Sequence, residues 1–382
     1  MSGSDFLRQL PDASRHFQKR RGLMYRLHID PVLMVLLLIL ACAGLFVLYS
    51  GSGESEADVT RQAIRLCLAF GVMLVFAQLD PSVYRRWSPW LFLIGTVALV
   101  GVLVMGTGAK GAQRWLQIPG LPRFQPSEFM KLAVPMMVSW YLSERYLPPS
   151  FKHIIGTMVI IFVPTVLILK QPDLGTSLLI AASGIFVLFF SGISWKLVGS
   201  FFAIVASFTP VMWFFVMRDY QKQRVMTMLN PEADPLGTGW NIIQSKTAIG
   251  SGGMSGKGWL LGTQSQLDFL PESHTDFIIA VLAEEFGFVG VMLLLTLYLM
   301  IIARGLYIAV NAPDSFSRLL AGSLVMTFFV YIFVNIGMVS GILPIVGVPL
   351  PLVSYGGTSI VTLLAAFGVL MSIHTHRKML ER

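Results

Sequence analysis

Long apolar stretches constrain the fold of this 382-residue chain more than any other feature. An α-helix needs about 20 mostly apolar residues to cross the hydrocarbon core of a bilayer. Ten such stretches are present, at 31–50, 62–79, 88–106, 127–145, 153–170, 174–192, 195–217, 276–303, 317–342 and 355–373. Because backbone groups in lipid must be satisfied within the segment itself, each stretch predicts a helix. The predicted fold class is therefore an all-α polytopic membrane protein with about ten transmembrane helices.

The basic residues are spread unevenly between the connections, and their distribution predicts the orientation of the helices. They gather at both ends of the chain and in alternate short connections, such as those holding Arg85 and Lys152. Cytoplasmic loops carry an excess of Lys and Arg. We therefore expect a cytoplasmic basic segment at 1–29, one membrane domain at 30–373 and a cytoplasmic tail at 374–382. Every unusual connection then falls on the outer face.

The composition excludes several other classes of protein. Charged residues make up 13% of the chain, against about 25% in soluble domains. The net charge of +8 follows the membrane topology, so it does not indicate a nucleic-acid partner. Cys42 and Cys67 lie inside apolar stretches and are expected to pack as small hydrophobes rather than to bind metal or form a disulfide. The sequence also contains no P-loop and no motif with metal-ligand spacing.

The longest outer connection, 218–275, holds five cations and a glycine-rich run. Arg224, Lys246 and Lys257 are among these cations, and the glycine-rich run extends over 250–262. A connection of this length without secondary structure is uncommon and usually functional. Because glycine adopts many backbone conformations, we expect an irregular and mobile loop.

Glu128 and Lys131 lie three residues apart at the start of the helix predicted at 127–145, so they share one helix face. Two interpretations stay open. The two charges can neutralise each other, which lets the helix carry them into the membrane. Alternatively, Lys131 lines a cavity that is open to an anionic headgroup, because ionisable groups at membrane depth are often functional.

Two further outer connections hold polar residues with both structural and functional interpretations. Asp173 precedes the helix predicted at 174–192, so it suits either an N-cap or a substrate site. Lys110 and Arg114 lie in a cationic loop next to Trp115. This loop either rests at the lipid interface, where tryptophan is enriched, or binds an anion. The sequence leaves these alternatives open.

Asp276 is the strongest candidate for chemistry. It ends the long connection, two residues after His274, where outer water meets the helix predicted at 276–303. Partial burial raises the pKa of a carboxyl group and nearby cations lower it, so such a group can be tuned to act as a general base. The alternative is a simple helix cap. Glu284 and Glu285, deeper in the same helix, are expected to be structural.

Five outer motifs together resemble the SEDS family of bacterial shape, elongation, division and sporulation proteins. In chain order they are Lys110-Gly-Ala-Gln-Arg-Trp115, Gln125-Pro-Ser-Glu128, Gln171-Pro-Asp-Leu-Gly-Thr176, Phe269-Leu-Pro-Glu272 with His274-Thr-Asp276, and Pro349-Leu-Pro-Leu-Val-Ser-Tyr-Gly-Gly357. The resemblance spans nearly the whole chain. Residues 244–253, 262–267 and 341–350 are more similar to the elongation branch of the family than to its division branch. Ile279 departs from the family pattern, in which Phe is usual.

The resemblance implies a peptidoglycan glycosyltransferase that polymerises lipid II for cell elongation and rod shape. It implies a location in the bacterial inner membrane, with the active face towards the periplasm. It further implies that Asp276 is catalytic and that Glu128 and Lys131 belong to a central cavity. The implied partners are a class B penicillin-binding protein, which is a transpeptidase, together with lipid II and membrane lipids.

The expected reaction needs one carboxylate and several cations. Asp276 takes the proton of a sugar 4-hydroxyl. The other residues expected in the substrate and diphosphate site are Lys131, Glu128, Arg114, Lys110, Arg224, Asp173 and His274. A divalent cation, Mg²⁺ or Mn²⁺, is an open alternative for part of the phosphate role. The competing functions are a lipid II flippase and a scaffold that positions the transpeptidase without chemistry of its own.

Overall fold

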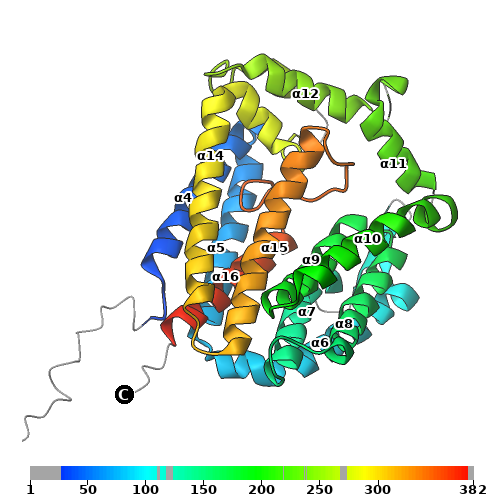
Figure 1. Ribbon diagram of the computed structural model, residues 1–382. Coiled ribbons are helices and arrows are strands. Elements are labelled where there is room, and N and C mark those ends of the chain that lie inside the picture. Colours follow the sequence, from blue (N-terminus) through cyan, green and yellow to red (C-terminus); the bar gives the residue numbers. More distant parts are fainter. Residues whose placement is uncertain are drawn as a thin grey trace, which may run out of the picture.

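The structure is a computed structural model that describes residues 27–109, 112–117, 124–217, 219–235, 237, 239–266 and 273–376. Within these residues, helices lie at all ten positions predicted from hydropathy and form one bundle (Figure 1). They are α4 (Pro31–Gly51), α5 (Glu56–Gln78), α6 (Pro81–Met105), α7 (Pro126–Ser143), α8 (Phe151–Lys170), α9 (Leu174–Phe190), α10 (Trp195–Val211), α14 (Ile278–Val310), α15 (Ser315–Val339) and α16 (Thr358–Thr375).

Most of these helices are long and apolar enough to cross a membrane. Eight satisfy both criteria, with α10 extended by the π-helical turn η1 (Met212–Val216). The helix α9 is apolar but has 17 residues, and α7 has 18 residues with Glu128 and Lys131 among them. Both pack between other helices of the bundle. The prediction of a multi-pass, almost wholly α-helical membrane protein is therefore confirmed.

Two helices begin earlier than hydropathy predicts, because polar caps extend them beyond their apolar stretches. The helix α5 begins at Glu56 rather than at 62, and the Ser55 side chain caps its first turn. The helix α6 begins at Pro81 rather than at 88, with Asp80 as its cap. Such caps satisfy backbone N–H groups that the first turn of a helix leaves without partners.

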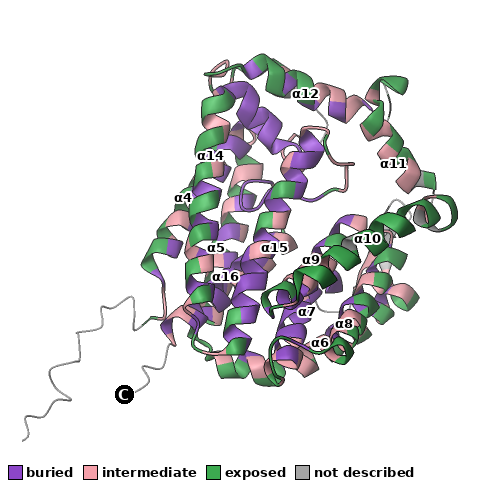
Figure 2. Cartoon of the chain, in the orientation of Figure 1, coloured by how far each residue is buried: buried purple, intermediate pink, exposed green. Residues whose placement is uncertain are grey.

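The interior consists of two packed groups of helices that α7 and α15 connect. The larger core is built from buried side chains of α4, α5, α14, α15 and α16, and the smaller core mainly from those of α6, α7, α8 and α9. The helix α7 packs on α15 and α16, and α15 packs on α9. Large apolar side chains remain exposed around the outside of the bundle, as lipid-facing residues do (Figure 2). None of the described side chains of α10 is buried.

The 218–275 connection is more regular than its composition suggests. It contains α11 (Asp219–Leu229), the short turn η2 (Pro231–Ala233), α12 (Trp240–Gly252) and α13 (Thr263–Gln266). The helices α11 and α12 lie across one end of the bundle, which we call the loop face (Figure 1). A Cβ at Gly252 or Gly256 would overlap backbone atoms of α14. The expectation of a connection without secondary structure is therefore wrong for α11, α12 and α13. Residues 253–262 form no helix or strand, as expected, but Gly256 permits close packing on α14.

A short antiparallel hairpin departs from the all-α expectation. It pairs β1 (Thr107–Ala109) with β2 (Ala112–Trp115) in the connection between α6 and α7. An isolated two-stranded hairpin is at best marginally stable in water. Contacts of β2 with α6 and α7 hold this one against the bundle.

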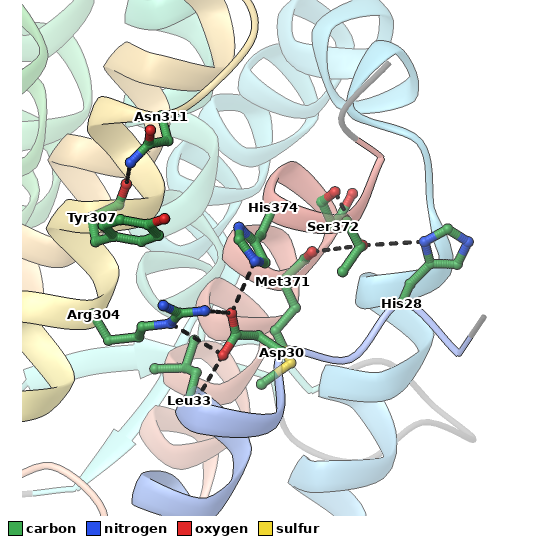
Figure 3. A network of polar contacts seen from close by, with 10 residues as sticks. His28, Asp30, Leu33, Arg304, Tyr307, Asn311, Met371, Ser372 and His374 are labelled. Atoms are coloured by element: carbon green, nitrogen blue, oxygen red, sulfur yellow. Dashed lines mark hydrogen bonds and ion pairs between the residues drawn. The ribbon is translucent and has the colours of Figure 1, made fainter. Parts of the chain in front are cut away.

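The opposite end of the bundle, which we call the tail face, is held together by buried Asp30 (Figure 3). As the N-cap of α4, its carboxylate accepts the Leu33 N–H at 2.8 Å. Arg304 of α14 lies 2.6 Å from the same carboxylate, and His374 of α16 lies 3.3 Å from it. One fully buried side chain thus links three helices at the tail face.

Candidate active site

The connection between α15 and α16, residues 340–357, is the part of the loop face where several candidate residues meet. Its residues 350–354 are buried although they form no helix or strand. Asn335 of α15 is fully buried, and its Nδ2 donates to the carbonyl oxygens of Val348 at 2.8 Å and of Asp276 at 2.9 Å. This single amide therefore fixes the connection against the turn that precedes α14.

Asp276 lies in that turn with a partly exposed side chain. A Cβ built at Gly347 would lie 3.5 Å from its Oδ2, so the carboxylate borders a stretch of backbone that carries no side chain. Gly347 has a φ of +73°, a conformation that favours glycine. The N-cap position of α14 belongs to Phe277. Asp276 is thus placed beside the 340–357 connection and is not the N-cap residue of α14.

Two cations of the long connection reach the same segment. Nη1 of Arg224, on α11, donates to the Ile345 carbonyl at 2.8 Å. Nζ of Lys246, on α12, lies 2.8 Å from the point where a Cβ at Gly341 would stand. Lys257 instead forms an ion pair with Glu284 of α14 at 2.7 Å. Cationic and acidic side chains therefore converge on residues 341–347.

Asp173 caps α9 and also joins two of the predicted motifs. Its Oδ2 lies 3.4 Å from the donor Nε2 of Gln125 and 3.9 Å from Nε of Arg114. Two residues further on, a Cβ at Gly175 would stand 2.9 Å from the Val346 carbonyl oxygen. The start of α9 thus packs directly on the 340–357 connection. The Asp173 carboxylate therefore has both expected roles: it caps α9, and it contacts Gln125 and Arg114 of two other motifs.

Glu128 and Lys131 form a buried ion pair, with 2.6 Å between Oε1 and Nζ. The second carboxylate oxygen of Glu128 accepts the Thr362 hydroxyl at 2.8 Å, and the Lys131 ammonium lies 5.1 Å from the centre of the Tyr331 ring. The geometry of mutual neutralisation is therefore present. Lys131 also lines a mostly apolar cavity of about 20 Å³ between α7, α15 and α16. That volume suits a water molecule and is far too small for a sugar headgroup.

Arg65 of α5 is a cation that the sequence motifs did not single out. Its guanidinium lies 4.7 Å from the centre of the Tyr355 ring, and Nη1 donates to the Gly356 carbonyl at 3.5 Å. His274 meets the same ring edge-on at 5.9 Å, and its carbonyl accepts the Tyr355 N–H at 2.8 Å. Tyr355 thus connects Arg65 to the turn that carries Asp276. The sequence could have identified Arg65 as a candidate, because it is a basic residue inside the apolar stretch 62–79.

Comparison with known proteins decides the family. Residues 30–379 match the sequence family described as cell cycle protein, whose name combines FtsW, RodA and SpoVE. The chain is a SEDS protein. The family expected from the loop-face motifs is thereby confirmed over nearly the whole chain.

Curated SEDS relatives are similar to this chain along almost all of their length. The peptidoglycan glycosyltransferase MrdB of Escherichia coli K12 is 55% identical over 357 residues, which cover 94% of this chain and 96% of MrdB. The probable peptidoglycan glycosyltransferase FtsW of Trichlorobacter lovleyi is 36% identical over 365 residues, which cover 92% and 94% of the two chains. The higher identity to MrdB agrees with the elongation branch.

Solved SEDS structures share the fold. A chain from a peptidoglycan synthase complex that coordinates polymerization and crosslinking superposes with a TM-score of 0.80 at 28% identity, over 92% of this chain and 98% of that chain. The crystal structure of the rod shape determining protein RodA of Thermus thermophilus superposes with a TM-score of 0.67 at 26% identity, over 92% and 98% of the two chains.

Among the described residues, contacts at the loop face link the SEDS motifs to one another. The 340–357 connection contacts Asp276, Arg224 and the start of α9, where Asp173 lies. The pair of Glu128 and Lys131 joins α16 through a hydroxyl of that helix. Lys110 and the segment 267–272 lie outside the described residues.

Proposed function

We propose that this SEDS protein polymerises lipid II into glycan strands on its loop face, with Asp276 as the general base. The chain is a peptidoglycan glycosyltransferase, as its relatives are named. The observation that carries the proposed role of Asp276 is the convergence on residues 341–347. A partly exposed carboxylate and two cations approach this one segment from three elements.

The reaction requires a base near a diphosphate. The 4-hydroxyl oxygen of N-acetylglucosamine attacks C1 of N-acetylmuramic acid, and the bond from C1 to the lipid diphosphate breaks. The hydroxyl proton passes to the Asp276 carboxylate. Because diphosphate is a stable leaving anion, no second carboxyl group has to protonate it, unlike in most glycosidases. A single displacement converts the α-linked donor into a β-1,4 product.

Cationic side chains have the complementary role of stabilising charge on the departing diphosphate. Arg224 is the best placed, because its contact with Ile345 lies two residues from Gly347, which Asp276 faces. Lys131 is neutralised by Glu128 at 2.6 Å, so it can take this role only after that ion pair opens. Arg114, Lys110, Asp173 and His274 are proposed to contact the remainder of the substrate.

A divalent cation, Mg²⁺ or Mn²⁺, would be held largely by the diphosphate of the substrate. The described part of the chain contains no cluster of three His, Cys, Asp or Glu side chains that could hold a metal ion. Hard divalent cations are commonly bound through substrate phosphates and one or two carboxylates. Asp276 faces the 340–357 connection and Asp173 caps the helix that packs on it, so these two carboxylates would complete the coordination.

The proposed location is the bacterial inner membrane, with the loop face in the periplasm. Lys and Arg are concentrated in the terminal segments and the tail-face connections, which supports cytoplasmic termini. The proposed partner is a class B penicillin-binding protein that crosslinks the new strand. This proposal draws on the fold shared with the chain from the peptidoglycan synthase complex.

The decisive experiment measures lipid II polymerisation by purified protein with its transpeptidase partner. Asp276→Asn keeps the shape of the side chain but removes the base, so polymerisation should stop while folding and complex formation persist. Asp219→Asn, an exposed acid at the start of α11, is the matched control and should retain activity. Polymer made at the normal rate by Asp276→Asn would refute the role of Asp276.

A leaflet-accessibility assay in vesicles distinguishes the flippase alternative from the polymerase. Protein that moves labelled lipid II between leaflets without making polymer would favour the flippase. A scaffold without chemistry would give neither signal while it still bound the transpeptidase.

A further inference from the structure

The helix α14, which begins two residues after the proposed base, is interrupted at Gly287. Gly287 has a φ of +62° and a ψ of −161°, which is not helical. The break separates an outer segment, 278–286, from the long segment 288–310. Asp276 lies two residues before the outer segment, so the orientation of that segment determines where its carboxylate stands.

Residues of the long connection replace the hydrogen bonds that the break removes from the long segment. In a continuous helix the N–H groups of Phe288 and Val289 would donate to carbonyls four residues earlier. Here Phe288 donates to the Gly253 carbonyl at 2.9 Å and Val289 to the Met254 carbonyl at 3.2 Å. The donors at the break are therefore satisfied by the chain that follows α12.

The same stretch of chain satisfies the carbonyls of the outer segment. The Glu284 carbonyl accepts the Lys257 N–H at 3.0 Å, and the Glu285 carbonyl accepts the Gly258 N–H at 3.0 Å. Four hydrogen bonds to residues 253–258 thus stand in place of two within the helix. A Cβ at Gly287 would overlap backbone atoms of this stretch, so side chains at the crossing point are excluded.

Buried side chains strengthen this connection. Glu284 has no exposed surface. Its Oε1 accepts Nζ of Lys257 at 2.7 Å, the Thr263 N–H at 2.8 Å and the Gln264 N–H at 3.0 Å. A buried carboxylate is stable only when it is paired and hydrogen-bonded, as this one is. Glu284 therefore fixes residues 257–264 to the outer segment of α14.

From this geometry we infer that Glu284 and Lys257 are positioning residues for Asp276, an inference that rests on the proposed catalytic role of that aspartate. Glu284 lies six residues after the start of α14 at Ile278, which is about 9 Å along the helix axis, and Asp276 lies two residues before that start. A tilt of the outer segment by about 10° would therefore move its start, and with it the turn that carries Asp276, by about 1.5 Å. A misplacement of about 1 Å can reduce an enzymatic rate about 100-fold.

The first test compares variants of Lys257 in the lipid II polymerisation assay with the intact complex. Lys257→Met keeps the aliphatic stem but removes the charge, and should lower kcat about 10- to 100-fold with little change in KM. Lys257→Arg should restore most of the rate, because it retains the charge. Lys222→Met, the same change of charge on α11, is the matched control and should behave as the unmodified protein. Equal kcat for all of these variants would overturn the inference.

The second test reports the position of residue 276 without using activity. Asp276→Cys is combined with Cys42→Ser and Cys67→Ser, and the rate of labelling by a membrane-impermeant maleimide is measured. Adding Lys257→Met should change this rate at least severalfold, whereas adding Lys222→Met should not. An unchanged rate with Lys257→Met would count against the positioning role even if kcat falls.

The two tests separate failure of this inference from failure of the proposed function. If Asp276→Asn still polymerises lipid II, the base assignment fails, but the labelling assay still measures whether Lys257 positions residue 276. If Lys257→Met does not fold, Thr263→Val provides a milder variant, because it removes only the hydroxyl that lies 3.1 Å from Glu284. Thr263→Val should alter both kcat and labelling in the same direction, and wild-type values for both would reject the inference.

Discussion

Replacing Asn335 by leucine should disconnect Asp276 from the loop that it faces. Asn335 is fully buried, and its side-chain amide donates hydrogen bonds to the carbonyls of both Asp276 and Val348. Leucine has a similar volume, so Asn335→Leu removes both donors without opening a large cavity. The perturbation therefore acts on the hydrogen bonds rather than on packing.

The magnitude follows from the two carbonyl groups that lose their partners. Each buried acceptor left unsatisfied costs about 1–3 kcal/mol. The Asn335 Oδ1 atom is itself buried without a hydrogen-bond partner, so its removal offsets part of this cost. We expect a net destabilisation of about 2–4 kcal/mol. If Asp276 shifts by about 1 Å as a result, kcat should fall by about 10- to 100-fold.

The assay combines initial rates of lipid II polymerisation with thermal unfolding of the purified protein. The matched control is Asn311→Leu at the other end of α14, where the amide donates to the Tyr307 carbonyl at 2.8 Å in an exposed position. The control should change stability by no more than about 0.5 kcal/mol and leave the rate unaltered. An Asn335→Leu protein with both the melting temperature and the rate of the unmodified protein would refute the reasoning.

Three further predictions follow from the loop face. Lys131→Met should reduce the yield of folded protein, because it leaves Glu128 as an unpaired buried charge at a cost of about 3–5 kcal/mol. Adding Glu128→Gln should recover the yield, measured by size-exclusion chromatography, but should not recover polymerisation. A normal yield from Lys131→Met alone would contradict this prediction. Gly347→Ala should lower the polymerisation rate, because it adds backbone strain of about 1–2 kcal/mol and places a methyl group 3.5 Å from the Asp276 carboxylate. The control variant Gly53→Ala, at a φ of +64° with open space around it, should leave the rate unchanged. Equal rates for the two variants would contradict this prediction. If the substrate diphosphate holds a divalent cation, chelation should abolish polymerisation, and either Mg²⁺ or Mn²⁺ should restore it. Metal analysis should find neither ion bound to the protein without lipid II. Tight binding of either ion without lipid II would show that the protein, rather than the diphosphate, holds the metal.

The membrane helices were predictable from sequence because lipid imposes a length and an apolar composition on each of them. Their starts were less predictable where a polar cap extends the helix, as at Glu56 and Pro81. The long connection was misread because glycine serves two purposes, conformational freedom and close backbone approach. Only the neighbouring backbone of α14 reveals that Gly252 and Gly256 serve the second purpose.

The candidate site was predictable where a polar residue stands at a membrane boundary. Asp276 and Asp173 could be identified in this way, but the loop that gathers them could not, since residues 340–357 are distant in sequence from both. Asn335 and Arg65 were missed because each lies inside an apolar stretch and appeared to belong only to a helix. A polar side chain in such a stretch indicates that another group of the protein forms a hydrogen bond or ion pair with it.

The Asp30 contacts at the tail face determine where the bundle can change shape. An acid without exposed surface, held by an arginine of α14 and close to a histidine of α16, resists separation of these helices at that end, because breaking a buried ion pair is costly. Rearrangements of the bundle should therefore pivot near the tail face and grow in amplitude towards the loop face. Long substrates can then be admitted and released while the helices stay joined at the base.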